Sequence, residues 1–120
     1  MSTHGIIIPC FNEGQRLNTS LFVEFLKHHR NIFFVFVNDG STDNTHDLLK
    51  SMADECSAMI HIVELKSNSG KAEAIRCGVD YILKNHKVSS VGYWDADLST
   101  FLSEIPKFIH FLREDPKFSS

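Results

Sequence analysis

The chain has 120 residues, 42% of them hydrophobic and 22% charged, which is ordinary for one globular domain with a sizeable core. Its net charge of −3 provides no basic footprint for nucleic acid, so nucleic-acid binding is not expected. Its three widely spaced cysteines form neither a disulfide framework nor a zinc pattern, which favours a reducing, cytoplasmic compartment.

Four apolar runs alternate with four amphipathic segments along the chain. The runs cover residues 5–8, 32–37, 60–65 and 88–94. Pro9 is expected to stop the first run because proline cannot donate to a sheet ladder, and the partial alternation of the third suggests an edge strand. Continuous apolar strands are typical of a parallel sheet that is buried on both faces. Even the longest run is far too short to cross a bilayer, and the first residues show no signal-peptide pattern.

Helical periodicity fills the spaces between these runs. A period of 3.6 residues predicts helices over 14–28, around 48–53, over 71–84 and from 103 onward. Ser41, Thr42 and Asp43 are good capping residues for the second helix, and Pro106 suits the first turn of the fourth. The order βαβαβαβα predicts a doubly wound α/β fold, a mostly parallel sheet with helices on both faces, as one domain over 1–120.

Each predicted strand ends in a polar stretch, and these stretches should share one rim of the sheet, where open α/β sheets bind ligands. Phe11 offers a flat face to a base, and Asp39 can accept the ring N–H of uracil or guanine. Lys71 opens a helix whose positive end attracts phosphate. Asp95 and Asp97 are hard oxygen ligands suited to Mg²⁺ or Mn²⁺. Together these features predict a nucleotide-diphosphate pocket.

Every one of these signals also has a structural alternative. The Asp-x-Asp stretch and the Asp39 turn can simply cap helices, Phe11 can belong to the core, and 68–71 can be an ordinary loop. The last of these is not a P-loop, because it lacks the earlier glycine and has Ala72 at the hydroxyl position. No Gly-x-Gly-x-x-Gly follows the first strand, which argues against a nicotinamide-binding domain. Four signals at four equivalent positions favour the pocket.

The motifs, in their order, resemble the family 2 glycosyltransferases with the A-type nucleotide-sugar fold. Residues 6–13 are similar to that family's opening strand and its Pro-x-Tyr/Phe-Asn-Glu signature, and 36–45 to its Val-Asp-Asp-Gly-Ser element. Residues 68–78 resemble its third motif and 95–97 its metal motif. The lysine after Gly70 and the sequence at 97–99 resemble members that make polyprenyl- or dolichyl-phosphate-linked sugars.

The resemblance implies a UDP- or GDP-sugar donor and an inverting transfer to a lipid phosphate or a saccharide. Pro9, Phe11 and Glu13 would frame the base and ribose. Asp39 would hydrogen-bond the base, and Lys71 would lie near the base or the diphosphate. A lipid-phosphate acceptor would place the chain at the cytoplasmic face of a membrane.

The resemblance also implies a metal site and reveals two departures from the family pattern. Asp97 would ligate Mg²⁺ or Mn²⁺, and Asp95 would contact the ribose or the metal. Asn38 stands where the family has the first aspartate of a pair. No residue matches the catalytic base, which is expected beyond Ser120, so 1–120 is interpreted as the donor-binding half, with the acceptor half absent.

Two alternatives come from other classes of protein. A catalytically incomplete interaction module would keep the fold and form homo-oligomers through the surface that a missing half would cover. A nucleotidyltransferase would share the nucleotide-binding logic, but its glycine-rich basic signature after the first strand is absent.

Overall fold

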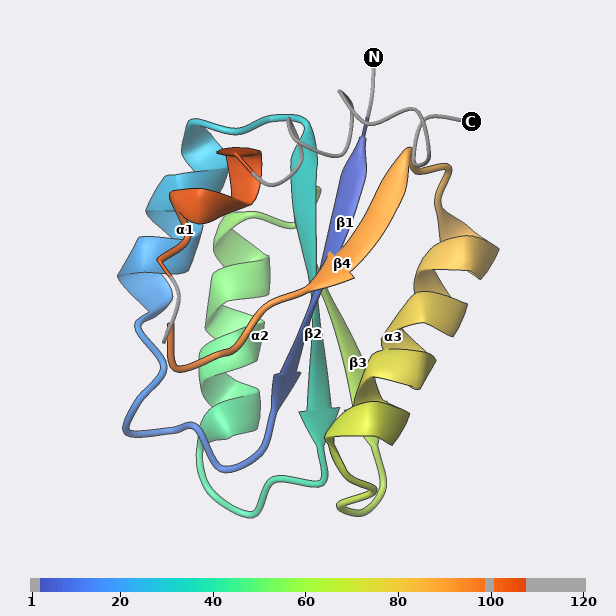
Figure 1. The fold of residues 1–120 in the computed structure, drawn as a ribbon. Helices are drawn as coiled ribbons and strands as arrows, with labels where there is room; N and C mark the ends of the chain where they lie inside the picture. Colours follow the sequence, from blue (N-terminus) through green and yellow to red (C-terminus); the bar gives the residue numbers. More distant parts are fainter. Residues whose placement is uncertain (1–2, 99–100, 108–120) are drawn as a thin grey trace.

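The fold, seen in a computed structural model that describes residues 3–98 and 101–107, is a parallel sheet between helices (Figure 1). Within these residues the elements in chain order are β1 (His4–Cys10), α1 (Thr19–Lys27), β2 (Ile32–Asp39), α2 (Thr45–Glu55), β3 (Ile60–Leu65), α3 (Lys71–Asn85) and β4 (Ser90–Tyr93). The strands are all parallel, in the order β3-β2-β1-β4. Helices α1 and α2 cover one face and α3 the other, so the predicted doubly wound fold is confirmed.

The core consists of one apolar cluster on each face of the sheet. Every residue of β2 is buried, as expected for a strand covered on both faces. On the α1 and α2 face, Phe22 packs edge-to-face against Phe34 and Phe36, with ring centroids 5.6 Å and 5.3 Å away. On the α3 face, side chains of β1 and β2 pack against Ala74 and Ile82. The partly alternating run at 60–65 forms β3 at an edge of the sheet, as its pattern predicted.

Strand β1 is longer than the sequence predicted, because Pro9 lies inside it. Pro9 pairs in register with Val37 of β2. On the other side of β1, strand β4 ends at Tyr93, opposite Ile7, and its ladder closes with the amide of Trp94 donating to the Ile7 carbonyl at 2.9 Å. The Pro9 nitrogen, which carries no hydrogen, therefore faces the side of β1 beyond the end of β4, where no strand needs an N–H donor.

Helix α1 begins later than predicted, because the residues before it fold into a rim loop. Helix α1 begins at Thr19, where the Asn18 side chain accepts a hydrogen bond from the Leu21 amide at 3.2 Å. Before it, the Glu13 carbonyl closes a separate turn. Helix α2 begins at Thr45.

The segment after β4 crosses to the face that α1 covers (Figure 1). Residues 104–107 form a helical turn there, and Leu102 and Ile105 are buried in that core. The predicted fourth helix is therefore present at its start. Its other predicted core residues, Phe108, Ile109 and Leu112, lie outside the described residues.

Candidate functional site

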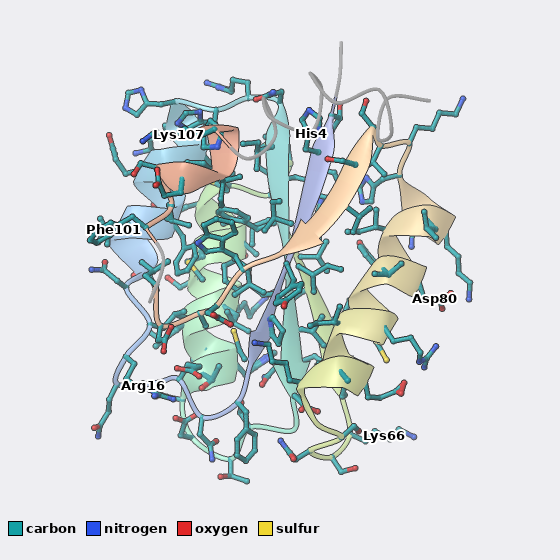
Figure 2. All side chains as sticks on the ribbon, in the orientation of Figure 1. His4, Arg16, Lys66, Asp80, Phe101 and Lys107 are labelled. Carbon is teal, nitrogen blue, oxygen red and sulfur yellow. The ribbon has the colours of Figure 1, made fainter. Side chains whose placement is uncertain are left out.

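All seven predicted site residues lie at or beyond the carboxyl ends of the strands, at the lower edge of the sheet in Figure 1 or in the segment that leaves β4. Figure 2 shows Arg16 and Lys66 at this edge and His4 at the opposite one. Pro9 is half-buried near the end of β1, and the Phe11 side chain just beyond the strand is 42% exposed. An exposed ring at the rim is available for stacking, and the core alternative for Phe11 is wrong.

The loop after β1 is hydrogen-bonded to the loop after β2 through Asn12. The Asn12 amide donates to the Ser41 hydroxyl at 3.0 Å, and the Asn12 side-chain oxygen accepts from the Thr42 amide at 2.8 Å. Asn12 has a φ of 51°, in the left-handed region that asparagine tolerates better than most residues. This residue therefore both shapes its own loop and binds the neighbouring one.

A second set of bonds joins the same two loops. The Glu13 amide donates to the buried Thr45 hydroxyl at 2.9 Å, and the Gly14 amide donates to the Asp43 carboxylate at 3.0 Å. The Thr45 hydroxyl in turn donates to Asp43, and this bond is the main cause that lowers the pKa of Asp43. We call these contacts, together with those of Asn12, the loop clasp. Asp43 thus connects loops as well as serving the start of α2.

Asp39 is only 3% exposed, and its carboxylate binds the loop between β3 and α3. One oxygen accepts from the Ser69 amide at 2.7 Å and the other from the Gly70 amide at 3.0 Å. The Asn68 side-chain amide donates to the same carboxylate at 3.3 Å. Asp39 therefore holds the phosphate-binding candidate loop in position, a structural role that sequence reasoning did not assign to it.

Asn38, the departure from the family's aspartate pair, faces a carboxylate. Its side-chain amide donates to Glu64 on β3 at 3.0 Å, and the other Glu64 oxygen binds the His46 ring at the start of α2. Asn38 is 3% exposed, so an aspartate here would place a buried carboxylate against the partly exposed carboxylate of Glu64. The asparagine therefore matches its neighbour Glu64.

Lys71 and Asp95, 24 residues apart, meet across the rim. The Lys71 ammonium lies 2.9 Å from Asp95 Oδ1 and 5.1 Å from the centroid of the Tyr93 ring. The hydrogen bond to Asp95 is the main cause that raises the pKa of Lys71, and Asp97 adds to it. Two of the predicted site residues are thus in direct contact, and the structure adds Tyr93 to them.

Glu13 and Asp97 come from opposite ends of the sequence and act on one another electrostatically. Burial raises the pKa of Glu13, and the charges of Asp97 and Asp43 raise it further, against the pull of Arg16. Glu13 Oε2 is shielded from solvent and has no hydrogen-bond partner among the described residues. A buried acceptor without a partner at a ligand rim is a place for a donor group such as a ribose hydroxyl.

The turn that carries Asp97 is strained. The next residue, Leu98, has a φ of 56°, a left-handed conformation that is rare for a bulky side chain. It is held there because the Leu98 amide donates to the Asp95 carbonyl at 3.1 Å and its side chain packs against the core. Strain of this kind is concentrated at functional sites.

The carboxylates of Asp95 and Asp97 suit Mg²⁺ or Mn²⁺ better than a metal ion whose ligands must all come from the protein. Asp95 and Asp97 are partly exposed carboxylates on one short turn. In the described part of the chain, no group of three His, Cys, Asp or Glu side chains is placed to hold a metal ion. Mg²⁺ is commonly held by one or two carboxylates together with substrate phosphates, so two ligands agree with that mode.

Comparison with known proteins identifies the family. The model of the family named Glycosyl transferase family 2 matches residues 5–119. An undecaprenyl-phosphate 4-deoxy-4-formamido-L-arabinose transferase of Yersinia pestis is 30% identical over 114 residues, covering 91% of this chain and 33% of its own.

Solved structures share the fold at low sequence identity. TarS of S. aureus in complex with UDP-GlcNAc aligns with a TM-score of 0.69 at 21% identity, over 92% of this chain and 31% of its own. The mannosyltransferase PcManGT from Pyrobaculum calidifontis, in complex with GDP-Man and Mn²⁺, aligns with a TM-score of 0.66 at 21% identity, over 94% of this chain and 32% of its own. The chain spans about a third of the length of each of these relatives. The chain belongs to the family 2 glycosyltransferases, and its fold is the A-type fold of nucleotide-sugar transferases.

Proposed function

We propose that this chain is the donor-binding part of an inverting glycosyltransferase, which takes a UDP- or GDP-sugar together with Mg²⁺ or Mn²⁺. The observation that carries the proposal is the Lys71–Asp95 contact at the point where β1 and β4 diverge. In doubly wound sheets a ligand lies at this switch point, because the connections leave it in opposite directions. Here the rim presents a cation, two carboxylates and an exposed ring at once.

Each part of a nucleotide-sugar has a matching group on the rim. Phe11 offers its face to the base, beside Pro9. The unpartnered oxygen of Glu13 suits a ribose hydroxyl. Lys71 is released from Asp95 to the diphosphate, whose charge exceeds that of one carboxylate, and Asp95 is then available to the ribose or the metal.

Asp39 contributes to binding of the nucleotide-sugar mainly by holding the loop between β3 and α3 in position. Its carboxylate oxygens already accept from Ser69 and Gly70, and each retains accepting capacity for the ring N–H of a base. Asp97, with Asp95, would hold the divalent cation, which supplies charge neutralisation on the departing nucleoside diphosphate.

The acceptor in this proposal is a polyprenyl phosphate. The sequence at 97–99 and the lysine at 71 support it, as does the lipid-phosphate substrate in the name of the Yersinia relative. The catalytic base and the acceptor-binding part then lie beyond residue 120, and transfer takes place at the cytoplasmic face of a membrane. None of the helices in the described residues is long and apolar enough to span one.

Calorimetric titration of the 120-residue chain with UDP-glucose and GDP-mannose, with and without Mn²⁺, tests the donor site. We expect weak, Mn²⁺-dependent binding of one of the two sugars. Asp97→Ala should abolish the metal dependence and leave the melting temperature nearly unchanged. The control is Asp80→Ala, which removes a carboxylate on α3 that pairs with Lys84. Absence of metal-dependent binding would refute the donor site, and a large loss of stability in Asp97→Ala would favour a capping role.

A further inference from the structure

The last residue of β4 and the first residue of α3 meet at the rim of the sheet. Tyr93 ends β4, and Lys71 begins α3. Tyr93 pairs in register with Ile7 of β1, which belongs to the apolar core cluster on the α3 face. Because residues in register on neighbouring strands point to the same face, the Tyr93 ring also lies on the α3 face. The Lys71 ammonium lies over this ring, 5.1 Å from its centroid.

Burial in the core does not explain the position of the Tyr93 ring. Tyr93 is 53% exposed, whereas its register partner Ile7 is fully buried. A ring that remains in water contributes little hydrophobic stabilisation to the sheet. An ammonium is attracted to the face of an aromatic ring when it lies within about 6 Å of the centroid, so the contact with Lys71 is close enough to be effective.

The side chain of Lys71 is long and largely exposed, so it needs other groups to hold it in place. It is 56% exposed, and its ammonium lies 2.9 Å from Asp95 Oδ1 as well as over the Tyr93 ring. A lysine that is free in water loses much rotamer freedom when it is fixed on a phosphate. Two contacts that fix it beforehand reduce this loss and so favour binding.

The two contacts of Lys71 respond differently to a nucleotide diphosphate. The Asp95 carboxylate competes with the diphosphate for the same N–H groups, and in the proposed function Asp95 then turns to the ribose or the metal. The Tyr93 ring attracts the ammonium through its face and accepts no conventional hydrogen bond from it. Its attraction therefore continues while the N–H groups of Lys71 are donated to phosphate oxygens.

We infer that Tyr93 is a positioning residue for the donor, whose ring keeps the Lys71 ammonium at the diphosphate after Asp95 has released it. The inference rests on the proposed donor site and adds a residue to it. Loss of an exposed contact between a cation and a ring should weaken diphosphate binding about three- to fivefold. Binding of the free nucleoside, which has no phosphate for Lys71, should not change.

Titration of UDP and GDP, each with Mn²⁺, into variants of Tyr93 tests this role. We expect Tyr93→Leu to weaken binding of the better-bound nucleotide about three- to fivefold and Tyr93→Phe, which keeps the ring, to leave it nearly unchanged. In a Lys71→Met background, Tyr93→Leu should have no further effect. The matched control is Phe101→Leu, which removes an exposed ring far from α3 (Figure 2). Additive losses in the double variant, or equal losses in the two Tyr93 variants, would overturn the inference.

A measurement without nucleotide separates failure of this inference from failure of the donor site. In NMR spectra of the nucleotide-free chain, the Tyr93 ring should shift the ε-methylene protons of Lys71 upfield of those of Lys84, which pairs with Asp80. The shift should vanish in Tyr93→Leu and remain in Tyr93→Phe. Absence of the shift in the unmodified chain would overturn the inference even if UDP or GDP binds. If the shift is present but neither nucleotide binds, the donor site is refuted, and the role of Tyr93 with it.

Discussion

Replacing Asp39 by asparagine tests whether this carboxylate holds the loop between β3 and α3. The change keeps the shape of the side chain but turns one acceptor oxygen into an NH₂ donor. Each oxygen accepts a backbone amide, from Ser69 at 2.7 Å or from Gly70 at 3.0 Å. Whichever oxygen is replaced, one backbone N–H then faces another donor on the buried Asp39 side chain.

The expected cost follows from these two bonds. An unsatisfied buried N–H costs about 1–3 kcal/mol, and the remaining bond weakens because its acceptor is no longer charged. We expect Asp39→Asn to lower the free energy of unfolding by about 2–4 kcal/mol, a fall of about 10 °C in melting temperature for a chain of this size.

Urea denaturation of the nucleotide-free chain measures this loss, and amide hydrogen exchange at Ser69 and Gly70 should accelerate with it. The matched control is Asp54→Asn, an exposed aspartate on α2, which should change stability by less than about 0.5 kcal/mol. If Asp39→Asn were as stable as this control, Asp39 would not be a structural residue, and a role restricted to the base would explain it better.

Three further predictions concern the rim. Gly40→Ala should lower the free energy of unfolding in urea by about 2–4 kcal/mol, because Gly40 has a φ of 71° and an added Cβ would lie 2.4 Å from the Asn68 backbone nitrogen. In the control Gly92→Ala the added Cβ meets only Ile6, at 3.7 Å, so the free energy of unfolding should change little. The Thr45 hydroxyl lowers the pKa of Asp43, so the stabilising contribution of this carboxylate is present above the unfolded pKa of about 3.9 and is lost as pH falls through the lower folded pKa. Thr45→Val should therefore reduce the loss of stability below about pH 4, and an unchanged dependence of stability on acid pH would contradict the assignment. Lys71→Met should weaken binding of UDP or GDP about tenfold and binding of the free nucleoside hardly at all, whereas equal losses for both would place Lys71 at the base.

The arrangement of the sheet was predictable because a strand that is buried on both faces has a continuous apolar sequence. The eight residues of β2 are all buried, and their unbroken apolar character reports this directly. The partial alternation at 60–65 likewise predicted the edge position of β3. Helix starts were less predictable, because Ser41, Thr42 and Asp43 have the composition of a cap but mostly bind another loop.

The rim as a place could be predicted, but its contacts could not. The partners of Asp39 are backbone amides 30 and 31 residues further on, and backbone groups have no signature in a sequence. The Lys71–Asp95 contact depends on the path of the segment after β4, which includes a leucine in a left-handed conformation. The conformation of Asn12 could have been predicted, because asparagine in a loop often adopts the left-handed backbone conformation.

The loop clasp changes what the family's motifs can be taken to report. Asn12, Asp43 and Thr45 bind other residues of the chain, so these contacts join the loops to one another. A chain that had lost every contact with nucleotide would still need them to fold its rim. A search that selects active enzymes by these motifs alone would therefore also select inactive proteins. Turnover is better judged from groups that are placed to meet the donor itself, such as the buried oxygen of Glu13.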